Sequence, residues 1–210
     1  MQHLKLTAVL TDIPVVRRKI QEPMADLNEQ DLIRRIGAGD QGAFTIVYRE
    51  WQGPIYRFAW HMSGNVPVAE EVMQETFLAL MQRSTGFDSS RGSLGSYLFG
   101  ITRNILSKRI RDKSSCETSD FSGEEHEIPS TGPDPWAALS RQQLIDTVRA
   151  AVVSLPMPYR EAVALCDLEE LSYEAAAQAL DCPVGTVRSR LSRGRLLLGM
   201  KLKEFARVNV

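Results

Sequence analysis

Residues 171–195 have the sequence LSYEAAAQALDCPVGTVRSRLSRGR, which predicts two short helices joined by a tight turn. Ser172 is a suitable N-cap, and Glu174 places a negative charge in the first turn, where the helix dipole favours it. The first helix is therefore expected to run to Leu180. The turn that follows contains helix-breaking residues: Asp181, Cys182 and Pro183.

The second of these helices has one apolar face and one polar, basic face. At about 100° per residue, its apolar side chains fall on one narrow stripe: Val184, Val187, Leu191, Leu198 and Leu202. The opposite side carries Arg188, Ser189, Ser192 and Arg193. One face can pack while the other meets DNA, which predicts a helix-turn-helix DNA reader. The alternative is a solvated basic helix that closes a helical bundle.

The composition is that of an ordinary globular protein with mainly helical patterning. The chain has 210 residues, of which 43% are hydrophobic, and two small helical domains fit its patterning best. No apolar run approaches the roughly 18 residues that span a bilayer, and no secretory signal is evident. The three cysteines, Cys116, Cys166 and Cys182, match neither a disulfide framework nor a CxxC metal pair. We therefore expect reduced thiols, a cytoplasmic location, no membrane insertion and no bound metal.

The net charge of −1 hides a segregation of charge along the chain. Residues 183–207 hold seven Lys and Arg against one Glu, and residues 103–113 hold five against one Asp. Residues 114–135 contain six acidic residues and no Lys or Arg. The chain thus has two basic surfaces that suit nucleic acid, separated by an acidic segment that cannot favour it.

The periodicity along the chain predicts an all-α fold with two small helical domains. Residues 1–26 form an extension without a sustained period, 27–113 a first domain, 114–135 a flexible acidic linker and 136–207 a second domain. In the first domain we expect a core helix over residues 44–62, bent at Gly53-Pro54, and another around residues 69–80. A last helix from Ser93 is expected to bury Leu94, Leu98, Ile101 and Ile105.

The helix around residues 69–80 carries an acidic face opposite its apolar stripe. That face consists of Glu70, Glu71, Gln74 and Glu75. It is either a solvated surface or a docking site for a basic partner. No histidine, cysteine or metal-spaced group accompanies these carboxylates, so the pattern does not indicate catalysis.

The helix that begins at Ser93 combines an apolar stripe with cations and amides. Its cations can hold phosphates, and Asn104 could read the edge of a base. Nearby aromatic side chains, Phe87, Tyr97 and Phe99, either stack on an unpaired base or belong to the core.

Four ordered motifs together resemble the extracytoplasmic-function (ECF) group of bacterial RNA polymerase sigma factors in the sigma-70 family. These small members keep only regions 2 and 4. The motifs are AEEVMQETF at 69–77, FDSSRGS at 87–93, YLFGITRN at 97–104, and residues 171–190. The resemblance covers roughly residues 27–113 and 136–205.

The resemblance implies three contact surfaces. The acidic face would dock the clamp of the polymerase beta-prime subunit through Glu70, Glu71, Gln74 and Glu75. The first basic helix would recognise and help melt the minus-10 element through Tyr97, Arg103, Asn104, Lys108 and Arg111. The helix-turn-helix would bind the minus-35 element through Arg188, Ser189, Arg190, Ser192 and Arg193. The beta flap and an anti-sigma factor are further implied partners.

The chain departs from the family pattern at three positions. Val68 stands where the family often has Asp, Glu71 replaces another frequent Asp, and Tyr97 stands where the family usually has Trp. The face around Glu71 keeps its acidic character, and tyrosine can also stack on a base.

The prediction is therefore a transcription initiation factor of the stress-response type. It would be neither an enzyme nor cofactor-dependent, and it would bind core RNA polymerase and promoter DNA. The main rival is an autonomous repressor or activator that uses the same helix-turn-helix. An enzyme with an attached DNA-binding module ranks last, because residues 27–113 contain no nucleophile, phosphate loop or metal constellation.

Overall fold

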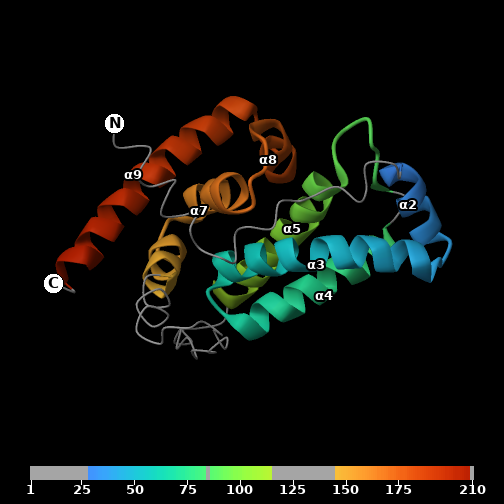
Figure 1. Ribbon diagram of the computed structural model, residues 1–210, viewed down its shortest axis with the longest axis horizontal. Helices are drawn as coiled ribbons and strands as arrows, with labels where there is room; N and C mark the ends of the chain where they lie inside the picture. Colours follow the sequence, from blue (N-terminus) through green and yellow to red (C-terminus); the bar gives the residue numbers. More distant parts are fainter. Residues whose placement is uncertain (1–27, 84–85, 115–144, 209–210) are drawn as a thin grey trace, which may run out of the picture.

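The computed structural model describes residues 28–83, 86–114 and 145–208. The helices are α2 (Glu29–Gly37), α3 (Gln41–Ser63), α4 (Val66–Gln82), α5 (Leu94–Ser114), α7 (Met157–Val163), a π-helix η2 (Ala164–Leu168), α8 (Tyr173–Leu180) and α9 (Val184–Val208) (Figure 1). Residues 145–153 are also helical. These ranges contain no strand, which confirms the all-α prediction. The predicted extension, the predicted linker apart from Ser114, and residues 136–144 lie outside the described residues.

The junctions between the first helices follow from their polar residues and glycines. The Asp40 carboxylate accepts hydrogen bonds from the backbone N–H groups of Gly42 at 2.8 Å and Ala43 at 3.1 Å, and so caps α3. Gly64 ends α3 in the left-handed conformation, with φ at 67°, and Asn65 then caps α4. Helix α3 continues through Pro54 as one element.

Helices α3, α4 and α5 pack against one another through apolar faces, which the sequence predicted for α4 and only in part for α5. The predicted stripe of α4 is buried at Ala69, Val72, Thr76, Phe77 and Leu80. On α5 the buried side chains are Leu94, Ser96, Leu98, Phe99, Thr102 and Leu106, whereas Ile101 and Ile105 are only half-buried. The buried hydroxyls of Thr76 and Thr102 lie within hydrogen-bond distance of each other, at 3.1 Å, and each also reaches a carbonyl of its own helix, so the contact ties α4 to α5.

Two of the three aromatic residues considered for base stacking belong to the core. Phe99 is fully buried and meets Trp51 and Phe58 edge to face, at ring-centre distances of 6.1 Å and 5.3 Å. Phe87 is also buried, with its ring centre 5.5 Å from that of Tyr97. The hypothesis that an unpaired base stacks on Phe87 or Phe99 is therefore wrong, because other side chains already cover both rings.

The contact between Gly95 and Trp51 gives a stability prediction. A Cβ atom on Gly95 would lie 2.3 Å from a ring carbon of Trp51, so Gly95→Ala must displace the indole. We expect it to lower the free energy of unfolding by about 1–3 kcal/mol. The control is Gly199→Ala in α9, where an added Cβ meets nothing within 4 Å. This substitution should raise the free energy of unfolding by up to about 1 kcal/mol through helix propensity. Urea unfolding measures both, and a Gly95→Ala variant at least as stable as the parent would refute this packing.

The second unit, formed by residues 145–208, contains the predicted helix-turn-helix. Ser172 caps α8 by accepting a hydrogen bond from the Ala175 N–H at 3.1 Å, and Asp181 ends that helix with a left-handed φ of 48°. The predicted apolar stripe of α9 is buried at Val187, Leu191 and Leu198, with Val184 and Leu202 half-buried. The two short helices and the tight turn between them are thus confirmed.

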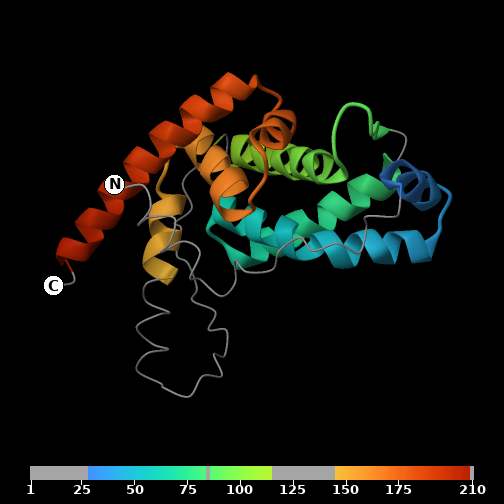
Figure 2. The ribbon, with the colours of Figure 1, turned by 45° about the horizontal axis from the view of Figure 1, so that its top comes forward.

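The first unit, which consists of helices α2 to α5, lies against the second unit. Helix α8 packs on α5, and both α7 and η2 reach α3 (Figures 1 and 2). Their buried apolar side chains form one continuous cluster. The linker joins two units that share a core, whereas the sequence pattern suggested separate ones.

Candidate functional site

The acidic face predicted from the sequence is exposed on α4. Glu70, Glu71, Gln74 and Glu75 all point to solvent, on the side of the helix away from its buried stripe. Arg109 of α5 donates to the Glu71 carboxylate at 2.6 Å and also to that of Glu75. The hydrogen bond to Glu71 is the main cause that raises the pKa of the Arg109 guanidinium. The four residues form a continuous acidic patch that is anchored to the neighbouring helix.

Sequence reasoning missed an apolar extension of this patch. Leu78 is 55% exposed and Met81 is 48% exposed. Leu78 follows Gln74 by one helical turn, so helical spacing could have found it. The acidic α4 surface, defined here as Glu70, Glu71, Gln74, Glu75, Leu78 and Met81, combines charge with apolar area, as protein-binding surfaces commonly do.

The predicted minus-10 residues on α5 do not share one environment. Asn104, Lys108 and Arg111 are exposed. Arg103 instead donates through Nε to the Glu161 carboxylate of α7 at 2.8 Å. The structure therefore brings Arg103 to the second unit and leaves the other three residues open to solvent.

Tyr97 lies half-buried at the start of α5. Its hydroxyl donates to the backbone carbonyl of Arg83 at 3.2 Å, and its partial burial raises the pKa of the phenol. Its ring packs against Phe87. The tyrosine thus has a packing role, and part of its side chain remains accessible.

The predicted minus-35 residues lie on the first turns of α9. Arg188, Ser189, Ser192 and Arg193 are exposed, and Arg190 is half-buried. The Ser189 hydroxyl donates to the Thr186 carbonyl at 2.9 Å. The Arg188 guanidinium lies 5.8 Å from the centre of the Tyr173 ring. Four of the five side chains can therefore reach a partner without rearrangement.

Arg195, further along α9, has a structural role. It donates to both oxygens of the Asp167 carboxylate, at 2.6 Å and 3.0 Å. A bidentate pair of this kind fixes orientation. It attaches α9 to the π-helix η2.

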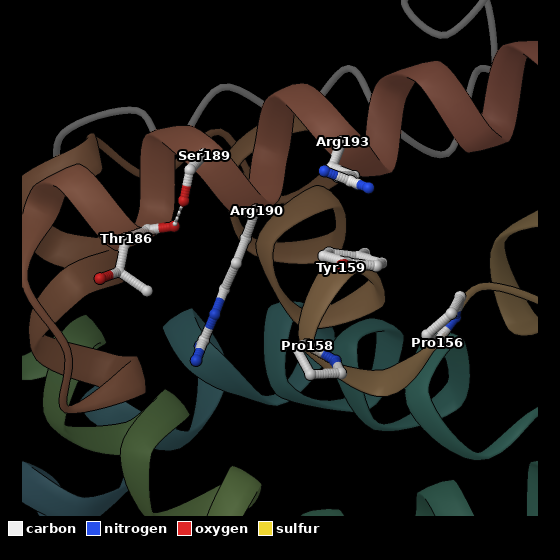
Figure 3. A pocket seen from close by; sticks show the side chains of 7 residues that line it. All are labelled: Pro156, Pro158, Tyr159, Thr186, Ser189, Arg190 and Arg193. Atoms are coloured by element: carbon white, nitrogen blue, oxygen red, sulfur yellow. Dashed lines mark hydrogen bonds between the residues drawn. The ribbon is translucent and has the colours of Figure 1, made fainter.

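A shallow cleft adjoins the exposed face of α9 (Figure 3). Its volume is about 470 Å³, and it lies between the start of α7 and the first turns of α9. The lining residues are Pro156, Pro158, Tyr159, Thr186, Ser189, Arg190 and Arg193. Three of these, Ser189, Arg190 and Arg193, are predicted DNA contacts. Sequence reasoning missed the α7 side of the cleft, because nothing in the sequence indicates how α7 and α9 are aligned.

Two ion pairs join the units at carboxylates that are almost fully buried. Arg57 of α3 donates to both oxygens of Glu169, at 3.1 Å and 2.7 Å, and the Glu169 side chain is 3% exposed. The Glu161 side chain, which receives Arg103, is 6% exposed. Arg160 adds a hydrogen bond to the Met62 carbonyl at 2.6 Å. In every case the two partners come from different units.

Burial raises the pKa of Glu169 to about 7, although Arg57 opposes this rise. From pH 4.5, the ordinary value, to about 7, the folded chain then holds more protons than the unfolded chain, so stability falls as pH rises. His61 has the opposite sign, because burial lowers its pKa from 6.5 to about 4. Arg149 and Arg57 add to the shift of His61, and Glu170 adds to that of Glu169. Above pH 6.5 the effect of His61 fades as the unfolded imidazole loses its proton, and the effect of Glu169 is the larger of the two.

We therefore expect the free energy of unfolding to fall by up to about 1 kcal/mol between pH 6.5 and pH 8. Glu169→Gln should flatten this decline, because the amide does not titrate. Urea denaturation at the two pH values measures the effect. An equal decline in the variant would assign the pH dependence to another group.

The described residues contain neither a metal cluster nor a membrane-spanning helix. No group of three or more His, Cys, Asp or Glu side chains within them could hold a metal ion. No helix in the same ranges is long and apolar enough to cross a bilayer. Cys166 and Cys182 are free thiols, and Cys116 lies outside the described residues.

Comparison with protein families defines the class. Residues 47–116 match the family described as Sigma-70 region 2, and residues 145–198 match Sigma-70, region 4. The first range holds the acidic α4 surface and the whole of the basic helix α5, and the second holds the helix-turn-helix. These are two sigma-70 regions on one chain.

Relatives of known function place the chain in one group of the sigma-70 family. The chain is 31% identical to the ECF RNA polymerase sigma factor SigW of Bacillus subtilis, over 82% of this chain and 95% of that protein. It is 33% identical to SigE of Mycolicibacterium smegmatis, over 75% of this chain and 62% of that longer protein. The chain belongs to the ECF sigma factors of the sigma-70 family, which are transcription initiation factors.

A solved structure supports the fold. The sigma factor RpoE of Bartonella quintana, solved in complex with the anti-sigma factor NepR, superposes with a TM-score of 0.63 at 24% identity. The superposition covers 76% of this chain and 96% of that one.

Proposed function

We propose that this chain binds core RNA polymerase and directs it to a subset of promoters by reading the minus-10 and minus-35 elements, while helping to open the strands. The observation that carries the proposal is the presence of an exposed acidic surface on α4 and exposed basic rows on α5 and α9 within one ECF sigma chain. A repressor would need only the row on α9. Residues 27–113 serve as region 2 and residues 136–207 as region 4.

The acidic α4 surface docks the beta-prime clamp. Glu70, Glu71, Gln74 and Glu75 supply charge and hydrogen-bond acceptors that steer a basic partner, and Leu78 with Met81 supplies apolar contact. Region 4 contacts the beta flap. Neither role involves a chemical step, so the chain acts as a binding factor and not as an enzyme.

The basic row on α9 and the basic row on α5 contact different promoter elements. Arg188, Ser189, Arg190, Ser192 and Arg193 contact the minus-35 duplex, where arginine pairs well with guanine edges and phosphates. Tyr97, Arg103, Asn104, Lys108 and Arg111 contact the minus-10 element, where strand opening frees bases to meet an amide or an aromatic ring. Each reader alone is weak, and joining both on one polymerase raises their effective concentration.

A protein partner of the anti-sigma class controls the chain. The support is a relative of the same fold, RpoE of Bartonella quintana, whose structure was solved with the anti-sigma factor NepR. The place of action is the cytoplasm, where core polymerase and the chromosome are.

Footprinting tests the two-reader proposal. Transcripts that rise on overproduction supply candidate promoters. On such a promoter, core polymerase with this chain should protect two patches about 25 base pairs apart and make bases near the downstream patch reactive to permanganate. A single patch protected equally well by the chain alone would favour the repressor.

A further inference from the structure

Arg109 of α5 contacts two carboxylates of the acidic α4 surface at once. Its Nη1 donates to Glu71 at 2.6 Å, and its Nη2 donates to Glu75. The two glutamates are one helical turn apart on α4, so a single guanidinium can reach both with separate N–H groups. One arginine thus joins two residues of the surface that is proposed to dock core polymerase.

The packing of α4 on α5 explains why Arg109 reaches both carboxylates (Figures 1 and 2). The two helices run antiparallel: the hydroxyl of Thr76 meets that of Thr102, while Arg109, two turns further along α5, meets residues that precede Thr76. Buried side chains, among them Thr76 and Thr102, already hold the two helices together. Ion pairs at a solvent-exposed surface add little to stability, so the main effect of Arg109 falls on the two carboxylates themselves.

The three charged side chains differ in exposure. The side chain of Arg109 is 28% exposed, whereas those of Glu71 and Glu75 are 62% and 46% exposed. Each carboxylate gives one oxygen to Arg109, and within the described part of the chain its second oxygen has no hydrogen-bond partner. A protein that approaches this face therefore meets two acceptor oxygens that lie further out than the guanidinium.

Arg109 restrains two side chains that would otherwise move independently. Like charges one turn apart on a helix repel each other, and an exposed glutamate side chain has many rotamers. Ordering such a side chain in an interface costs free energy, which lowers the affinity for the partner. The guanidinium offsets the repulsion between Glu71 and Glu75 and restricts both side chains before a partner binds.

We propose that Arg109 is a positioning residue for core docking: it holds Glu71 and Glu75 as a pair whose outer oxygens accept hydrogen bonds from cationic side chains of core polymerase. The inference rests on the proposed function and adds a residue to the same surface. It predicts the opposite effect on affinity from charge alone. By charge alone Arg109 weakens docking, because its guanidinium repels a basic partner, whereas by positioning the two carboxylates it strengthens docking.

Lysine at position 109 separates the charge of the side chain from its geometry. Lysine keeps the positive charge, but its single terminal nitrogen cannot present the rigid fork of N–H groups that Arg109 offers. We expect Arg109→Lys to weaken core binding by about threefold and Arg109→Gln by about tenfold, roughly the cost of ordering two side chains. If only charge acted, Arg109→Lys would bind like the parent and Arg109→Gln would bind more tightly.

Titration of purified core polymerase into the labelled full chain measures these affinities. Arg49→Gln is the matched control, because it removes one positive charge at an exposed position of α3, outside the acidic α4 surface. It should leave core affinity almost unchanged, and thermal melting shows that each variant is folded at the assay temperature. A parent that binds while Arg109→Gln binds equally well or better overturns the inference and leaves the proposed function intact. A parent that does not bind core polymerase overturns both.

Combined variants show whether Arg109 acts through the carboxylates that it holds. In a chain that carries Glu71→Gln and Glu75→Gln, Arg109→Gln should have little further effect on core affinity. In a chain that carries Glu70→Gln instead, Arg109→Gln should keep its about tenfold effect, because the hydrogen bonds of Arg109 go to Glu71 and Glu75. Equal effects of Arg109→Gln in the two chains would assign its role to the fold or to net charge and would overturn the inference.

Discussion

Reversing Glu70, Glu71 and Glu75 to lysine is expected to lower the affinity for core polymerase by at least about 100-fold and to abolish promoter-dependent transcription. The carboxylates are exposed, so the reversal changes the surface more than the fold. Placing like charges opposite a basic partner costs several kcal/mol. Binding of labelled core polymerase measures the loss.

The salt bridges to Arg109 require a control, because the reversal also breaks them. Glu71→Lys and Glu75→Lys combined with Arg109→Glu restores the internal pairs with inverted signs. This charge-swapped variant should melt like the parent and still fail to bind core polymerase. Recovery of core binding in the swapped variant would show that the ion pairs stabilise α4 and that its surface charge does not dock the partner.

Arg188→Ala is expected to weaken recognition of the minus-35 element by about 5- to 150-fold, the range of 1–3 kcal/mol for one good base contact. The side chain is exposed at the start of α9 and makes only a distant contact with the Tyr173 ring, so its removal should not affect folding. Promoter binding by the polymerase carrying the variant, with and without an intact minus-35 element, is the measurement.

Lys203→Ala is the matched control for Arg188→Ala. Lys203 is also an exposed cation on α9, near the opposite end of the helix from the turn. Its removal should change promoter binding little. Equal losses of promoter binding in the two variants would show that α9 attracts DNA by its general positive charge and not by specific contacts. A loss of core binding with Arg188→Ala would contradict the assignment of promoter contact to α9 and core contact to α4.

Local features of the fold follow from the sequence. Ser172, the broken turn at residues 181–183 and the apolar stripe of α9 predicted the helix-turn-helix, and the structure confirms all three. The acidic face of α4 lies where helical spacing put it. These features depend on neighbours three or four residues apart, which the sequence displays directly.

The contacts between the units could not be predicted, because their partners are 58 and 112 residues apart in the chain. A basic helix such as α5 has the same pattern whether its arginine faces solvent, DNA or another helix. Ile101 and Ile105 illustrate the same limit: the period placed them on a buried stripe, but the packing of α5 buries Phe99 and Thr102 instead. Tertiary packing decides which side of a largely apolar helix becomes the core.

Run-off transcription with purified core polymerase and this chain tests the central claim most directly. A fragment library from the host genome, transcribed with and without the chain, should yield new start sites whose upstream sequences share one minus-10 and one minus-35 motif at fixed spacing. The absence of any chain-dependent transcript, together with tight binding of duplex DNA by the chain alone, would contradict the claim.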